Sequence, residues 1–129
     1  MFPPDFPDEF VRDAFIAGSE AAWPPQSVAR VIRWFRKNGI AVLGTELWVV
    51  RDGTICPGIL VKGVQNIYGN DVSPRPDEHW ESYAVRSADE TLQYVNTLRL
   101  PPEAKEQGDI FFNVTWASES DFQELRASQ

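Results

Sequence analysis

The sequence predicts an α+β domain, with a mainly antiparallel sheet of four to five strands and about four helices packed mostly on one face. Three observations predict this class. Apolar residues recur at helical spacing over residues 25–38, β-branched and aromatic residues fill residues 40–50, and an Asp-Gly turn signal follows directly. Short strands joined by turns, with helices before and after them, are typical of antiparallel α+β folds.

The first third of the chain predicts two helices. Residues 1–8 contain three prolines, which predicts an extended Pro-rich segment. Residues 9–17 place apolar side chains at helical spacing until Gly18 ends the pattern. Residues 25–38 give the clearest helix, because a proline opens it, its apolar side chains share one stripe and Gly39 follows it.

A change to strand-like composition comes next. Residues 40–50 predict a strand, and Asp52-Gly53 predicts a hairpin turn to a partner strand that starts at residue 55. Residues 59–68 either continue that strand or bend into another one. Residues 69–77 are rich in turn-forming residues and predict a long loop.

The remaining elements alternate between strand and helix. Residues 80–85 predict a strand, and a capping-box pattern that begins at Ser87 predicts a helix over 88–98. Residues 110–116 predict a further strand, and Ser118 caps a short last helix. We find no sign of a domain boundary within 129 residues, so we expect a single globular domain.

Composition and charge exclude several classes of protein. The chain has 19 acidic and 12 basic residues, and the resulting net charge of −7 argues against a general nucleic-acid binder. No apolar run approaches the ~20 residues of a membrane span. Cys56 is the only cysteine, which excludes an internal disulfide. Because the N-terminus also lacks the pattern of a signal peptide, we expect a cytoplasmic protein with neither nucleic acid nor membrane as its partner.

No motif predicts an enzyme. His79-Trp80-Glu81 matches the His-x-Glu part of the zinc deaminase motif, but the Pro-Cys-x-x-Cys part that this chemistry needs is absent. The lone histidine has no nucleophile elbow beside it, and the glycines are scattered rather than gathered into a phosphate-binding loop. We therefore predict no catalytic residue, no metal site and no cofactor.

One carboxylate stands out in the strand over 40–50. Strand alternation places Glu46 and Trp48 on the same face, and both faces of this strand are largely apolar. Burial of a carboxylate costs free energy unless the group is paired. Glu46 could therefore lie in a pocket beside Trp48, as in a small hydrolase or ligand-binding domain, or it could lie at the surface or pair with an arginine. We favour the second alternative.

The net negative charge belongs entirely to the second half of the chain. Residues 1–65 hold seven basic and seven acidic residues, whereas residues 66–129 hold five basic and twelve acidic ones. Residues 68–83 combine acids, aromatics and a proline-restricted loop, which suits a protein interface because the acids steer a basic partner and the aromatics anchor it. The predicted partner-binding residues are Tyr68, Asp71, Asp77, Glu78, Trp80, Glu81 and Tyr83.

Two alternatives accompany this prediction. The same segment could be a solvated loop, with Trp80 packed into the core. The basic face of the helix over 25–38 is a second, weaker candidate interface, formed by Arg30, Arg33, Trp34 and Lys37.

Four stretches of the chain carry a family resemblance. They are Trp23-Pro24-Pro25, residues 31–35 (Val-Ile-Arg-Trp-Phe), residues 39–48 (Gly-Ile-Ala-Val-Leu-Gly-Thr-Glu-Leu-Trp) and residues 112–116 (Phe-Asn-Val-Thr-Trp). Together they resemble the immunity protein 40 family of bacterial polymorphic toxin systems. The resemblance implies a small cytoplasmic α+β protein that binds and neutralises one cognate toxin, and the acidity of the chain suggests that this toxin has a basic surface.

Overall fold

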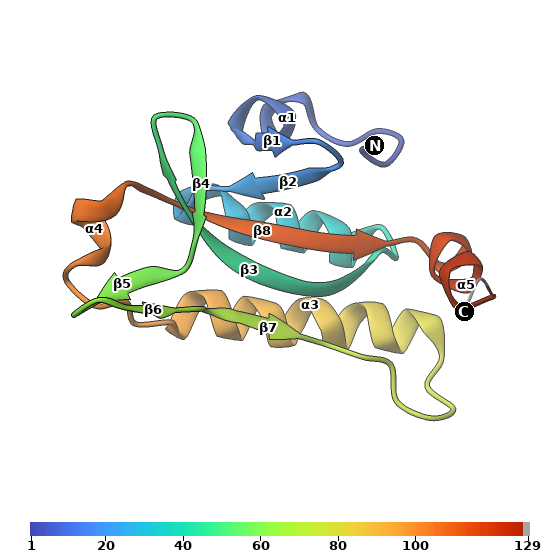
Figure 1. Cartoon of the computed structure of the whole chain (residues 1–129). Helices are drawn as coiled ribbons and strands as arrows, with labels where there is room; N and C mark the ends of the chain where they lie inside the picture. The colour runs from blue at the N-terminus through green and yellow to red at the C-terminus, as the bar shows by residue number, and fades with distance from the viewer. Residues whose placement is uncertain (128–129) are drawn as a thin grey trace.

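Six antiparallel strands form a sheet at the centre of the molecule, and helices α2 (Pro25–Lys37) and α3 (Trp80–Thr97) lie on one side of it (Figure 1). The computed structural model describes residues 1–127. The other helices are α1 (Asp8–Asp13), α4 (Ala104–Gln107) and α5 (Glu119–Ala127). The strands are β1 (Phe15–Ala17), β2 (Glu20–Trp23), β3 (Ala41–Arg51), β4 (Thr54–Pro57), β5 (Ile59–Val61), β6 (Val64–Asn66), β7 (Gly69–Asp71) and β8 (Asp109–Ala117).

Strand β3 organises the sheet. It pairs along one edge with β8, and its other edge is shared by β7 near its start and β4 at its end. The full strand order is β1-β2-β8-β3-β4, with β7 beside β3, and every pairing is antiparallel. The predicted α+β class with a mainly antiparallel sheet is therefore confirmed, and β5 and β6 form a second, two-stranded sheet.

The strongest sequence signals match the structure to within about one residue. Helix α2 begins at the proline that predicted it, and Gly39 follows its end with a φ of +70°. Asp52 and Gly53 both have positive φ, as a two-residue hairpin turn requires, and they join β3 to β4. The hydroxyl of Ser118 accepts a hydrogen bond from the backbone N–H of Asp121, which caps α5 as predicted.

The predicted strand over 80–85 is wrong, because these residues form the start of α3. The predicted capping box is also wrong, since Ser87 lies inside that helix. Its hydroxyl donates to the Ala84 carbonyl at 2.8 Å and accepts the Val42 N–H at 2.9 Å, so it satisfies the edge of β3 where no strand pairs. Burial recurs at the helical period along α3, at Tyr83, Ala84, Ser87, Ala88 and Thr91.

Residues 9–17 are only partly helical. Helix α1 ends at Asp13, and a short hairpin follows in which Gly18, with a φ of +62°, turns β1 into β2. A strand of three residues has too little alternation to be distinguished from a helix end in sequence. The Pro-rich segment before α1 packs on the core, because Phe6 is buried and stacks on Phe35 with ring centroids 5.7 Å apart.

Of the two alternatives predicted for residues 59–68, the structure shows the second, because β5 begins a separate strand and does not continue β4. The chain leaves the main sheet at Gly58, makes the β5–β6 hairpin and returns to β3 as β7, so the start of the predicted loop over 69–77 is a strand. Glycine is required at Gly58, where φ is +80° and an added Cβ would lie 2.2 Å from the carbonyl oxygen of Asn66. Glycine is also required at position 44, because β7 lies very close to Gly44: an added Cβ would be 2.3 Å from the carbonyl oxygen of Asn70 in β7.

The core lies between the sheet and the helices. Trp23 is at its centre, fully buried, and its indole N–H donates to the Phe10 carbonyl at 2.7 Å. Trp116 stacks on Phe35 nearby. A smaller apolar cluster covers part of the opposite face of the sheet, around Trp48, Val50, Phe15 and Phe111.

Candidate functional site

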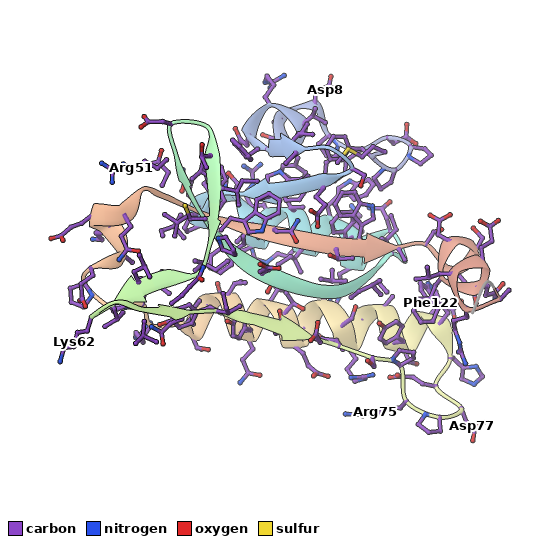
Figure 2. The ribbon with its side chains drawn as sticks, viewed as in Figure 1. Asp8, Arg51, Lys62, Arg75, Asp77 and Phe122 are labelled. Carbon is purple, nitrogen blue, oxygen red and sulfur yellow. The ribbon has the colours of Figure 1, made fainter. Side chains whose placement is uncertain are left out.

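The segment with the predicted partner-binding residues lies at one end of the molecule, between β7 and the start of α3. We call residues 72–79 the acidic loop. Figure 2 shows Arg75 and Asp77 at its tip, near Phe122 of α5. Asp77 has a φ of +61°, and Pro74 and Pro76 restrict the backbone on its N-terminal side. A hollow of about 590 Å³ separates the acidic loop from α5.

Three of the predicted carboxylates face solvent. Asp71 at the end of β7, Asp77 at the tip of the acidic loop and Glu81 in the first turn of α3 are all exposed. Within residues 1–127, none of the three makes an ion pair or a side-chain hydrogen bond. We call these three exposed residues, which lie within the acidic loop or within two residues of its ends, the acidic surface, and their charges are available to a partner.

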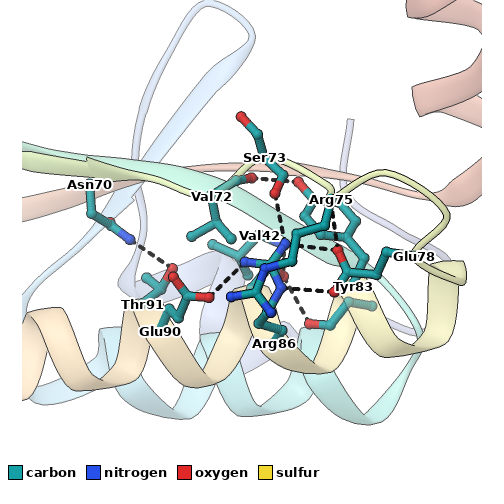
Figure 3. A network of polar contacts seen from close by, with 12 residues as sticks. Val42, Asn70, Val72, Ser73, Arg75, Glu78, Tyr83, Arg86, Glu90 and Thr91 are labelled. Carbon is teal, nitrogen blue, oxygen red and sulfur yellow. Dashed lines mark hydrogen bonds and ion pairs between the residues drawn. The ribbon is translucent and has the colours of Figure 1, made fainter.

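Glu78, by contrast, is used inside the protein. Its carboxylate accepts two hydrogen bonds from the Arg86 guanidinium, each 2.8 Å long, and a third from the backbone N–H of Arg75 at 2.9 Å (Figure 3). Arg86 also donates to the Glu90 carboxylate and to the Ser73 carbonyl, both at 2.7 Å. The Glu78 and Arg86 side chains are only 11% and 18% exposed, so this pair is shielded from solvent.

The three predicted aromatics lie deeper than the acids. Tyr83 is 1% exposed, and its hydroxyl donates to the Val72 carbonyl at 2.6 Å, so its side chain is not part of the surface. Trp80 is half-buried: its indole N–H donates to the Gly39 carbonyl at 2.8 Å and its ring packs on Phe122. Tyr68 is half-buried against the main core. The aromatics therefore fix the positions of the loop and α3.

The Arg86 contact has a measurable consequence for acid titration. Hydrogen bonds from Arg86, and then from the Arg75 backbone, lower the pKa of Glu78 from 4.5 to about 2. The pKa of Glu78 is lower in the folded protein than in the unfolded chain, so ionised Glu78 stabilises the folded state. This contribution to stability is complete above pH 4.5, declines as the pH falls further and is absent below about pH 2.

We expect an NMR titration of the Glu78 carboxyl carbon to give a midpoint near pH 2 in the wild-type protein. Replacing Arg86 with Lys, which cannot donate two parallel hydrogen bonds from a planar fork, should raise that midpoint. A wild-type midpoint near 4.5 would show that the Arg86 contact is not formed in solution.

The basic face of α2 is partly neutralised within the protein. Arg30 pairs with Glu9 and Arg36 pairs with Asp89, both through exposed side chains, whereas Arg33 and Lys37 have no ion pair within the described residues. The Trp34 ring packs edge-on against Phe6. This face therefore offers less free charge than its sequence suggests.

Glu46 and Trp48 lie on the face of the sheet opposite α2 and α3. Glu46 is half-exposed, beside Gly69 on one neighbouring strand and Asn113 on the other, and Trp48 is buried edge-on against Phe15. The surface hollows that the structure describes, of about 420 to 590 Å³, are lined by other residues. Glu46 and Trp48 therefore line none of the hollows that the structure describes.

The sequence prediction overlooked Arg86, which holds the acidic loop together. The signal was present: Arg86 stands four residues before Glu90, a spacing that places both on one helix face. It was hidden because the helix was predicted to begin only at residue 88.

Two further properties bear on the class of protein. Within residues 1–127, no three His, Cys, Asp or Glu side chains gather as metal ligands would. In the same part of the chain, no helix combines the length and the apolar composition needed to cross a membrane.

Comparison with known protein families identifies the family of this chain. A sequence model described as immunity protein 40 matches residues 13–116, which is most of the chain and includes α2, α3 and all of the sheet except the last residue of β8. The chain belongs to the immunity protein 40 family. Comparison with curated proteins and with solved structures gives no significant match.

Membership of immunity protein 40 confirms the family resemblance of the sequence and implies that the protein gives immunity to a toxin. The matched region contains β7, the acidic loop, Arg86 and all of the acidic surface.

Proposed function

We propose that this immunity protein 40 member neutralises one cognate toxin in the bacterial cytoplasm by tight, stoichiometric binding, without turnover. The acidic surface makes first contact with a basic surface of the toxin. The observation that carries this proposal is the set of three exposed carboxylates, Asp71, Asp77 and Glu81, which have no cationic partner among the described residues and lie beside a braced loop.

Opposite charges on the immunity protein and the toxin would supply the fast association that neutralisation needs. Opposite fields on two proteins raise the association rate by about 10- to 1,000-fold over an uncharged encounter. The net charge of −7 supplies the long-range field, and the acidic surface gives it a direction. Neither a metal nor a cofactor is needed for an inhibitor that acts by occlusion.

Co-expression tests the function directly. We expect the protein to rescue growth of cells that produce the toxin encoded by the adjacent upstream gene, and to co-purify with that toxin. A toxin from an unrelated system serves as the specificity control, and its host cells should not be rescued. Failure to rescue, together with failure to bind the adjacent gene product, would overturn the proposal.

A further inference from the structure

The Arg86 side chain links several parts of the acidic loop to α3. Its guanidinium makes four hydrogen bonds, of which two go to Glu78 and one to the carbonyl of Ser73, at opposite ends of the loop. The fourth goes to Glu90 one turn further along α3. Its guanidinium carbon also lies 5.6 Å from the centre of the buried Tyr83 ring. Arg86 therefore fastens both ends of the acidic loop to one face of the helix.

The acidic loop has few other means of holding its shape. Pro74 and Pro76 contribute no backbone N–H, so the loop makes few backbone hydrogen bonds of its own. Three are described: the Val72 N–H donates to the Leu43 carbonyl of β3, the Glu78 N–H donates to the Arg75 carbonyl, and the His79 carbonyl accepts from the Tyr83 N–H at the start of α3. The other loop contacts run through side chains, and Glu78 links its neighbour Arg75 to Arg86. Removing Arg86 would leave Glu78 and the Ser73 carbonyl without their main partner.

The shielding of this contact distinguishes it from the other ion pairs of the protein. The Arg36–Asp89 pair has exposed fractions of 44% and 53%, against 18% and 11% for Arg86–Glu78. Solvent screens exposed pairs and makes them weak, whereas a fork-shaped, partly buried pair fixes geometry. Arg86 is therefore suited to hold one loop conformation.

We propose that Arg86 is a positioning residue for toxin binding: it holds the acidic loop in its binding conformation before the toxin arrives. This inference rests on the proposed function. A loop ordered in advance does not lose conformational freedom on binding, and that loss otherwise reduces affinity. Asp77, at the loop tip, is then held in a fixed position before the toxin arrives, as Asp71 and Glu81 already are by the regular elements on which they lie.

Two substitutions that conserve net charge test this inference. Arg86→Lys removes the fork but keeps the positive charge, and Arg36→Lys is the matched control in an exposed pair that does not touch the loop. In the free protein, we expect Arg86→Lys to speed amide hydrogen exchange in residues 72–79 by about tenfold or more, with α2 and the second half of α3 unchanged. Arg36→Lys should leave exchange in the loop as in the wild type.

Stopped-flow binding to the purified cognate toxin gives the second measurement. Arg86→Lys should weaken binding by about tenfold while the salt dependence of association stays the same, because the field of the protein is unchanged. Glu78→Gln, which keeps the shape of the side chain, should weaken binding in the same direction and covers the case in which Arg86→Lys fails to fold.

The outcomes separate the two proposals. Unchanged loop exchange in Arg86→Lys, or a loosened loop with wild-type toxin affinity, would overturn the positioning role and leave the immunity function intact. A wild-type protein that does not bind the toxin would overturn the proposed function itself.

Discussion

Reversing the three charges of the acidic surface, by Asp71→Lys, Asp77→Lys and Glu81→Lys together, should slow association with the toxin by about 10- to 1,000-fold at low salt. The three carboxylates are exposed and unpaired within the described residues, so their removal breaks no contact inside the protein. The expected loss is therefore in the encounter and not in folding. Stopped-flow association measured over a range of salt concentrations checks it.

The control is a second triple variant with the same change in net charge. Asp52, Glu106 and Asp109 are exposed acids at the other end of the sheet, near the β3–β4 turn, α4 and the start of β8 (Figure 1). At 0.1 M salt, where interactions between charges are screened over about 10 Å, their reversal to Lys should lower the association rate much less than reversal of the acidic surface does. Equal losses in the two triple variants would mean that net charge alone steers the toxin and that the acidic surface is not the contact.

The second large effect concerns the core. Trp23→Ala should lower the free energy of unfolding by about 3–5 kcal/mol, since a fully buried indole is lost and a cavity remains. Trp23→Phe should cost about 1–3 kcal/mol, because it keeps an aromatic ring but leaves the buried Phe10 carbonyl without its donor. Urea denaturation followed by circular dichroism measures both.

Trp34 provides the comparison for Trp23. It is half-buried at the margin of the same aromatic cluster, so Trp34→Ala should destabilise the protein less than Trp23→Ala does. A Trp23→Ala variant with wild-type stability would contradict the position of Trp23 at the centre of the core.

The sequence predicted most of the fold where local signals agreed with one another. Helix α2, strand β3 and the Asp52-Gly53 turn each combine a periodic apolar pattern with a suitable terminal or turn residue, and the structure confirms all three. The prediction failed where tertiary contacts decided the outcome. Ser87 is a residue type that often caps helices. Its hydroxyl instead accepts a hydrogen bond from the Val42 N–H at the edge of β3, a strand far from Ser87 in the sequence.

The candidate site could be predicted by location but not by the role of each residue. Acidic composition identifies the segment 68–83, yet only the fold separates the exposed Asp71, Asp77 and Glu81 from Glu78, which binds Arg86. The Glu78–Arg86 contact depends on which face of α3 carries Arg86 and on the acidic loop folding back onto that face. The spacing of the residues in the sequence predicts neither. The burial of Tyr83 follows from the same packing.

The most direct test of neutralisation by occlusion is a titration of the toxin's own activity with this purified immunity protein. Tight binding without turnover predicts that activity falls in proportion to the amount added, vanishes at a fixed molar ratio and does not decline further with time. Complete inactivation of the toxin by a small fraction of an equivalent, given time, would contradict this account and would reveal a catalytic inhibitor.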